Sequence, residues 1–279
     1  MLGEHKPAYG SAPLPVTARP REATRWQRFD RWWLLLAAAI AIALFMYFGY
    51  PERYGRIFRF VIGSWAGDDG VFMTLKLTVV SFLFIIAVGM LMGVFRVSSV
   101  GILNRISSLY VEIVRGVPVL VWLLWIYFGM PDILHRIPGL ENAKIPDFTA
   151  AVFAFTFAYG AYMTEVFRAG IQSIAKGQME ASRSLGMNYV QAMRYVILPQ
   201  AVRVILPPMS NEFVTLLKDS ALVSILGLED LTRRGREWVG RYFTSFDTYL
   251  VVALTYLILT LFFTRVSSGI ERRLSVEKR

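Results

Sequence analysis

Residues 71–95 read VFMTLKLTVVSFLFIIAVGMLMGVF, and Lys76 is the only charged residue among them. A helix needs about 20 predominantly apolar residues to cross the hydrocarbon core of a membrane. Transmembrane β-strands are about half that length and alternate apolar with polar side chains, which this stretch does not do. The stretch therefore predicts a helix that spans a membrane.

Five more apolar segments of similar length occur along the 279 residues, and the chain is 55% hydrophobic with a mean hydropathy of +0.47. These values exceed those of ordinary soluble domains. We therefore expect an all-α, polytopic membrane protein with about six transmembrane helices. The five segments are residues 32–50, 110–130, 149–169, 205–226 and 249–266.

The positive charge of the chain follows a pattern typical of membrane proteins. The net charge is +10, and the basic residues lie in short clusters between the apolar segments rather than in one nucleic-acid-binding patch. On a six-helix topology most lysines and arginines fall on the side that holds both chain ends and the loop 168–203. We expect a multi-pass membrane protein with both termini in the cytoplasm.

The sequence contains no cysteine and only two histidines, His5 and His135. Disulfides, thiolate metal sites and thiol nucleophiles are therefore excluded. Two histidines so far apart do not indicate a Ser/His/Asp arrangement or a histidine-rich metal site. We expect no metal, no cofactor and no catalytic residue.

The two ends of the chain differ in composition from the apolar segments. Residues 1–31 carry several prolines and arginines without apolar periodicity, which predicts a flexible basic cytoplasmic tail, and residues 268–279 predict a second basic tail. Residues 32–70 predict an extra transmembrane helix followed by an extracytoplasmic amphipathic segment. A similar amphipathic pattern falls at 228–239.

The segment 32–50 has an alternative interpretation as a signal peptide, because basic residues precede it. A cleaved signal peptide ends in a site of small residues, and none follows at 49–52. We therefore expect that the helix is retained.

A polar stretch of the chain predicts a helical hairpin on the cytoplasmic side. Residues 177–186 read GQMEASRSLG, and a two-turn helix over 178–185 is expected to close at Gly186, because glycine accepts the left-handed conformation that ends helices. Asn188 is expected to cap a second short helix, which Pro199 is expected to stop because proline has no amide hydrogen. Such a hairpin is shaped to fit a groove in another protein.

The spacing of residues in this hairpin resembles a signature of type I ABC importer permeases. Glu180-Ala181-Ser182, three residues, Gly186, nine residues, Val196, one residue and Leu198-Pro199 are similar to the E-A-A, G, I and L-P positions of that family. Ser182 stands for the second alanine and Val196 for the isoleucine. Further motifs resemble the branch that imports histidine, arginine, glutamate, glutamine and opines. They are RGVP at 115–118, YGAY at 159–162, NE at 211–212 and KDSALVS at 218–224.

The resemblance implies a fold, a location in the bacterial cytoplasmic (inner) membrane and a set of partners. Residues 71–267 would form the five-helix type I permease domain, with two ATP-binding subunits, an extracytoplasmic substrate-binding protein and a second permease of the same or a homologous kind. The chain lacks a G-x-x-x-x-G-K-[ST] phosphate loop, so we expect no enzyme activity and ATP hydrolysis on a partner subunit. The resemblance places ATPase coupling on Glu180, Ala181, Ser182, Gly186, Leu198 and Pro199.

An ion-coupled secondary transporter of amino acids is the alternative, because such proteins also place ionisable residues inside the membrane. Its relay candidates are Glu112, Glu165, Glu212, Lys218 and Asp219. That class predicts repeated halves, which are not evident, and no hairpin of the importer type. The importer interpretation is therefore preferred.

The segment 205–226 carries the candidate substrate path. Adjacent helical residues point about 100° apart, so Lys218 and Asp219 cannot both face lipid. We expect Asn211, Lys218, Asp219 and Ser220 to border a path for a polar amino acid, whose ammonium and carboxylate need opposite partners.

Three other features carry structural expectations. Glu165 and Glu212 are expected near cytoplasmic helix ends, paired with Arg168 or Arg203. Gly116 and Pro118 are expected to loosen or kink a helix. The sequence does not identify the amino acid that is carried, the second permease, or the role of the first helix.

Overall fold

The computed structural model describes residues 31–64, 66–139 and 144–275, so the expected tail 1–31 lies outside these residues except for Arg31. The expected tail at 268–279 lies partly within them, and residues 268–275 continue helix α12. The chain divides into two compact units, Met1–Arg31 and Trp32–Arg279, and nearly all described residues belong to the second. The described residues form helices without a β-strand, apart from one isolated bridge between Gly70 and Asp230. The predicted all-α class is confirmed.

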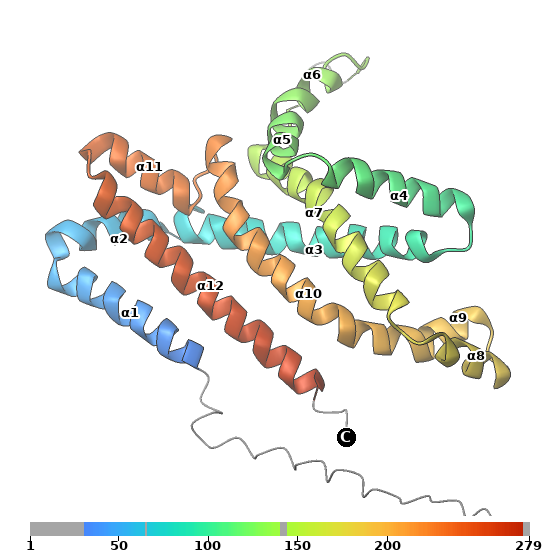
Figure 1. The fold of residues 1–279 in the computed structure, drawn as a ribbon. Coiled ribbons are helices and arrows are strands. Elements are labelled where there is room, and N and C mark those ends of the chain that lie inside the picture. Colours follow the sequence, from blue (N-terminus) through green and yellow to red (C-terminus); the bar gives the residue numbers. More distant parts are fainter. Residues whose placement is uncertain (1–30, 65, 140–143, 276–279) are drawn as a thin grey trace, which may run out of the picture. The chain divides into compact units, whose positions relative to one another are not determined.

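Helices follow one another along the second unit with short connections (Figure 1). The first group is α1 (Arg31–Gly49), η2 (Pro51–Gly55), α2 (Arg56–Ile62), α3 (Gly70–Val97), α4 (Gly101–Arg115), α5 (Val119–Leu124), η3 (Trp125–Gly129) and α6 (Met130–Leu134). The second group is α7 (Asp147–Gln172), α8 (Lys176–Ser184), α9 (Tyr189–Ala192), η4 (Met193–Ile197), α10 (Leu198–Asp219), η5 (Ser220–Ile225), α11 (Leu231–Tyr242) and α12 (Ser245–Ser275).

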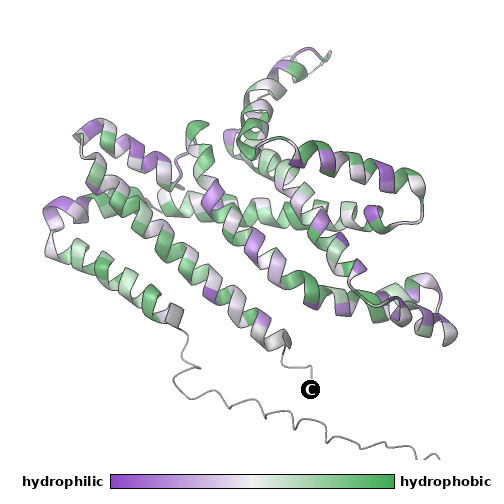
Figure 2. Ribbon diagram, in the orientation of Figure 1, coloured by the Kyte–Doolittle hydropathy of each residue, from purple (hydrophilic) through white to green (hydrophobic). Residues whose placement is uncertain are grey.

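Three of the described helices, α3, α7 and α12, are long and apolar enough to cross a membrane. Two bent pairs raise the number to five if each pair is one span: α1 with Pro51–Ile62, bent by 102°, and α4 with Val119–Leu134, bent by 100°. Hydrophobic residues cover α1, α3 and α12, whereas hydrophilic residues gather on α11 (Figure 2). The helices therefore have the composition of a membrane bundle, although the expected count of six is not established.

The apolar segment expected at 110–130 is divided between two helices. The helix α4 ends at Arg115 and α5 begins at Val119, with the 100° bend between them. Pro118 disfavours helical geometry in the residue before it and has no amide hydrogen to donate. The expected kink at Gly116 and Pro118 is confirmed, and the chain changes direction there.

The core of the bundle is the pair α3 and α7, which run in the same direction. A Cβ atom at Gly89 would collide with Met163, and one at Gly93 would collide with Phe167. Small residues at such positions let two helix backbones approach closely, which is how membrane helices gain packing energy without a hydrophobic driving force. This pair positions every element of the candidate site.

A second apolar cluster joins α1 and α2 to α11 and α12 through residues such as Leu36, Ile57, Leu231, Trp238 and Val252. The two predicted amphipathic segments are both helical where they were expected, as α2 and α11, and their apolar faces are buried in this cluster. The extra first helix is therefore packed onto the last helix of the chain.

Candidate coupling hairpin and substrate pathway

The first arm of the hairpin is α8, and it ends as the sequence predicts. Gly186 has φ +85°, the left-handed conformation that was expected. The amide of Gly186 donates to the carbonyl of Arg183 at 2.9 Å, and the amide of Met187 donates to the carbonyl of Ser182 at 3.2 Å. These bonds satisfy carbonyl groups that the end of a helix otherwise leaves without partners.

The second arm begins at Asn188, which caps α9 as predicted. The expected stop at Pro199 was wrong, because the chain continues through a π-helical turn, η4, directly into α10. The change from π to α geometry at Leu198 places Pro199 in the first turn of α10. Proline is tolerated there because the first amide groups of a helix have no partner within the helix.

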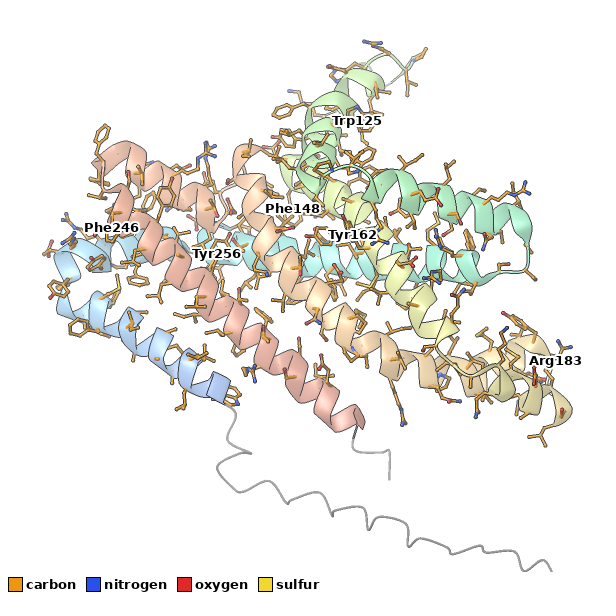
Figure 3. The ribbon with its side chains drawn as sticks, in the orientation of Figure 1. Trp125, Phe148, Tyr162, Arg183, Phe246 and Tyr256 are labelled. Carbon is orange, nitrogen blue, oxygen red and sulfur yellow. The ribbon has the colours of Figure 1, made fainter. Side chains whose placement is uncertain are left out.

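The surface of the hairpin is polar on α8 and apolar near its tip. Glu180, Ala181, Gly186, Leu198 and Pro199 are exposed, whereas Ser182 is buried and donates to the carbonyl of Gln178 at 2.6 Å. The hairpin also carries large exposed apolar side chains. Arg183, labelled in Figure 3, marks the position of α8. Leu185 is 81% exposed, Val190 70% and Tyr195 64%. Large contiguous patches of exposed apolar groups are typical of surfaces that contact another protein or a membrane.

Four residues were predicted to border the substrate path, and the structure separates them. Asn211 and Lys218 are exposed and lie two turns apart on one face of α10, with Thr215 between them. Asp219 points inward and accepts a hydrogen bond from the hydroxyl of Tyr159 on α7. Ser220 is fully buried and donates to the carbonyl of Leu217 at 2.7 Å, so it lies away from the exposed face.

A pocket of about 470 Å³ opens between the end of α4, the C-terminal half of α7 and α10. Its charged lining consists of Arg115, Glu165 and Glu212, and Tyr162, labelled in Figure 3, also lines it. The guanidinium carbon of Arg115 lies 5.2 Å from the centre of the Tyr162 ring. Sequence reasoning did not predict this pocket, although the helix break after Arg115 was a signal that the arginine lies at a bend.

The two glutamates of the pocket differ in their partners. Glu165 accepts a 2.9 Å hydrogen bond from Nε of Arg168, as expected, and its other carboxylate oxygen lies 3.7 Å from Nε of Arg96. Glu212 was expected near a cytoplasmic helix end, but it lies beyond the midpoint of α10, because that helix begins at Leu198 rather than at 205. Glu212 forms no hydrogen bond or ion pair with another described residue.

Comparison with known proteins identifies the family that has this architecture. Residues 85–276 match the family described as "Binding-protein-dependent transport system inner membrane component". The chain belongs to this family. Its members are the inner-membrane permease components of ABC importers, which work with a substrate-binding subunit and with a separate subunit that hydrolyses ATP. The predicted importer permease fold and inner-membrane location are therefore confirmed.

Two curated relatives show the branch of the family. The glutamine transport system permease protein GlnP of Escherichia coli (strain K12) is 34% identical over 208 residues, which cover 75% of this chain and 92% of GlnP. The arginine transport system permease protein ArtQ of Bacillus subtilis (strain 168) is 34% identical over 206 residues, covering 74% of this chain and 91% of ArtQ. The helices α1 and α2 precede residue 85 and lie outside the family match.

Two solved structures resemble the fold. A chain of an amino acid ABC transporter crystallised with histidines is 41% identical, with a TM-score of 0.67, and covers 73% of this chain and 92% of that chain. A chain of the MetNI methionine ABC transporter in an inward-facing conformation is 25% identical, with a TM-score of 0.58 and coverages of 72% and 92%. The bundle from α3 onward is thus that of an importer of this family.

Proposed function

We propose that this chain is the permease subunit of an ABC importer that moves a polar or charged amino acid into the cytoplasm. The substrate class rests on the names of its relatives and on the charged pocket between α4, α7 and α10. The single observation that supports it most is that this pocket presents a guanidinium and a carboxylate to the same space. Ionisable groups inside a membrane protein face a cavity or a pathway, since lipid does not solvate them.

The chemistry of the pocket suits a zwitterion. Arg115 offers hydrogen-bond donors in the planar arrangement that matches a carboxylate, so it would hold the α-carboxylate of the substrate. Glu212 would hold the α-ammonium group, because it has no described protein partner. Glu165 is already engaged with Arg168 and Arg96, so it would position the wall of the pocket rather than bind substrate.

The proposed substrate path continues from the pocket along the exposed polar face of α10, toward the C-terminal end of that helix. Asn211 and Lys218 would border it, and Asp219 would support it from behind through the hydroxyl of Tyr159. This face is open in the single chain, so we propose that a second permease, either a copy or a homologous chain, closes the path. Ser220 has no part in this route, since it is buried on the other side.

The hairpin would connect this path to ATP hydrolysis. We propose that two ATPase subunits bind to the two permeases, with Glu180, Gly186 and the apolar tip seated in a groove of each ATPase. The same arrangement requires both termini in the cytoplasm, with residues 71–267 forming the permease domain. The apolar exposure of Leu185, Val190 and Tyr195 supports a protein contact at this tip.

The pocket assignment is tested by reconstituting the complete complex in proteoliposomes and measuring ATP-dependent uptake of labelled amino acids. The variants Arg115→Gln and Glu212→Gln should lower uptake at least as strongly as Lys218→Ala, while Glu52→Gln, a change at an exposed carboxylate outside the pocket, should have no effect. Normal uptake by both pocket variants would contradict the assignment of the pocket and leave the family membership intact.

A further inference from the structure

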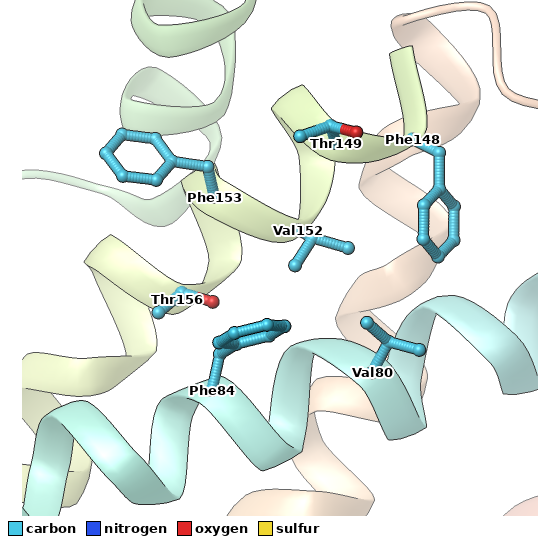
Figure 4. A pocket seen from close by; sticks show the side chains of 7 residues that line it. All are labelled: Val80, Phe84, Phe148, Thr149, Val152, Phe153 and Thr156. Carbon is cyan, nitrogen blue, oxygen red and sulfur yellow. The ribbon is translucent and has the colours of Figure 1, made fainter. Parts of the chain in front are cut away.

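An apolar groove lies between α3 and α7, away from the charged pocket (Figure 4). Its volume is about 290 Å³, and none of its lining residues belongs to the charged pocket. Both walls are helices with the length and composition of membrane spans. The lining residues are Val80, Phe84, Phe148, Thr149, Val152, Phe153 and Thr156.

Two parallel rows of side chains build the groove. Val80 and Phe84 are four residues apart on α3, and Phe148 and Val152 are four residues apart on α7. Residues four apart lie on one face of a helix, one turn above the other. Because α3 and α7 run in the same direction, the two rows line the groove along the bundle. Phe84 and Phe153 remain about half exposed at its sides.

Lys76 places a positive charge at one end of the groove. Lys76 precedes Val80 by four residues, so it continues the same row on α3. Its ammonium nitrogen lies 5.0 Å from the centre of the Phe148 ring and also forms an ion pair with Asp68. The side chain of Lys76 is 48% exposed, and that of Asp68 is 42% exposed, so both charges are accessible. An apolar groove with a cation and an anion at its opening is complementary to an amphiphile with a zwitterionic head group.

We propose that this groove is a binding site for a phospholipid with a zwitterionic amine head group. One acyl chain lies against Val80, Phe84 and Val152, the phosphate contacts Lys76, and the amine faces Asp68. Lys76 and Phe84 are separated by eight residues, a rise of about 12 Å along α3. The groove therefore holds the part of the acyl chain nearest the head group. The lipid occupies the groove of about 290 Å³ between α3 and α7.

The charges at the opening decide which lipid fits. A lysine with a neighbouring carboxylate carries no net charge, so a purely anionic head group gains less there than one that presents both signs. Diacylglycerol lacks the phosphate and would bind only through its chains. The structure therefore predicts the order phosphatidylethanolamine, then phosphatidylglycerol, then diacylglycerol.

The experiment uses native mass spectrometry of the purified importer complex with each of these three lipids added. The wild-type complex should retain phosphatidylethanolamine several-fold more than diacylglycerol. Val152→Phe, which fills the groove, and Lys76→Gln, which removes the ammonium group, should each lose most of this preference. Lys176→Gln makes the same chemical change at the first residue of α8, outside the groove, and should retain this preference. Equal retention of all three lipids by the wild type, or unchanged preference in Lys76→Gln, would overturn the proposal.

A second experiment separates a lipid from a protein occupant. The natural chain has no cysteine, so Val80→Cys places a single thiol in the groove. A nitroxide label there should be accessible to oxygen dissolved in the membrane. Disulfide-linked dimers of the unlabelled variant, or loss of oxygen access to the labelled variant in the assembled complex, would show that a second permease covers the groove, and would overturn the lipid assignment. This readout does not depend on transport, so it remains valid whichever substrate the importer carries.

Discussion

The side chains of Asn188 and Gln191 cap each other's backbones at the start of the second hairpin arm. Asn188 Oδ1 accepts the amide hydrogen of Gln191 at 2.9 Å, and Gln191 Oε1 accepts the amide hydrogen of Asn188 at 2.9 Å. Such a reciprocal pair satisfies two amide groups that the beginning of a helix leaves free. Because Gly186 turns the chain two residues earlier, these three residues together fix the angle between the arms.

Replacing Gly186 by valine should weaken coupling to the ATPase. A β-branched residue at φ +85° costs roughly 1 kcal/mol or more, and the cost comes from the backbone because no atom lies within 4 Å of the added Cβ. Gly177→Val is the matched control, since that site has equally open surroundings and no positive φ. Stimulation of ATP hydrolysis by the permease should fall in Gly186→Val alone, while both variants insert into the membrane. Equal stimulation in the two variants would contradict this role of the turn.

Removing the cap at Asn188 should loosen the second arm without unfolding the bundle. Loss of an N-cap side chain costs typically about 1 kcal/mol, so Asn188→Ala should reduce the affinity of the permease for its ATPase subunit. Asn188→Asp keeps an acceptor at the cap and should restore much of the affinity. The affinity is measured by titrating the ATPase subunit onto permease in nanodiscs. An Asp variant as weak as the Ala variant would argue against the cap as the cause.

Arg53 and Asp247 connect the extra N-terminal helix to the last helix. Arg53 donates two 2.8 Å hydrogen bonds to Asp247, and the hydroxyl of Tyr54 donates a third at 3.1 Å. Asp247→Asn and Arg53→Gln should each lower the melting temperature of the purified permease. The double variant should be no less stable than the worse single variant, because the two changes break the same contact. Fully additive losses would mean that each residue acts through other neighbours.

The stability of the segment around Asp230, at the start of α11, should depend on pH. Burial raises the pKa of Asp230 to about 6, against the opposing effect of the amides of Arg233 and Thr232 that donate to its carboxylate. A carboxyl group with a raised pKa in the folded state favours folding below its unfolded pKa, and this contribution is lost as pH rises through the folded pKa. The contribution of Asp230 to the stability of the folded state should therefore be lost between about pH 4 and about pH 6.

The variant Asp230→Asn isolates this effect, because asparagine caps a helix about as well as aspartate and does not titrate. The melting temperature of the variant minus that of the wild type should increase as pH rises across that window and then level off. A difference that stays constant over the same range would show that burial of Asp230 does not control its ionisation.

Local signals in the sequence predicted the hairpin and the helix break well. The turn at Gly186 and the cap at Asn188 depend only on nearby backbone groups, and the break at Pro118 depends on the absence of an amide hydrogen. The same local reasoning gave a wrong prediction at Pro199. The effect of a proline depends on where a helix begins, and the π-helical turn before Pro199 changed where the next helix begins.

The charged pocket could not be predicted from local patterns. Arg115, Tyr162 and Glu212 are far apart in the sequence, and they meet only because α4 bends sharply and α7 lies between α4 and α10. Likewise, the polar segment 211–220 reads as one cluster in the sequence, yet Ser220 faces the interior while Lys218 faces outward. Tertiary packing decides both points, and periodicity alone does not record which face a neighbouring helix covers.

ATP-dependent uptake by the reconstituted complex tests the central claim most directly. Proteoliposomes that contain the permease, its ATPase subunit and its substrate-binding protein are supplied with internal or external ATP as the orientation of the complex requires. Uptake of labelled polar amino acids is then measured with and without ionophores that collapse proton and sodium gradients. The proposed function predicts uptake that requires ATP and the binding protein and is unchanged by the ionophores. Uptake without ATP that stops when the ion gradients collapse would contradict it and favour an ion-coupled transporter.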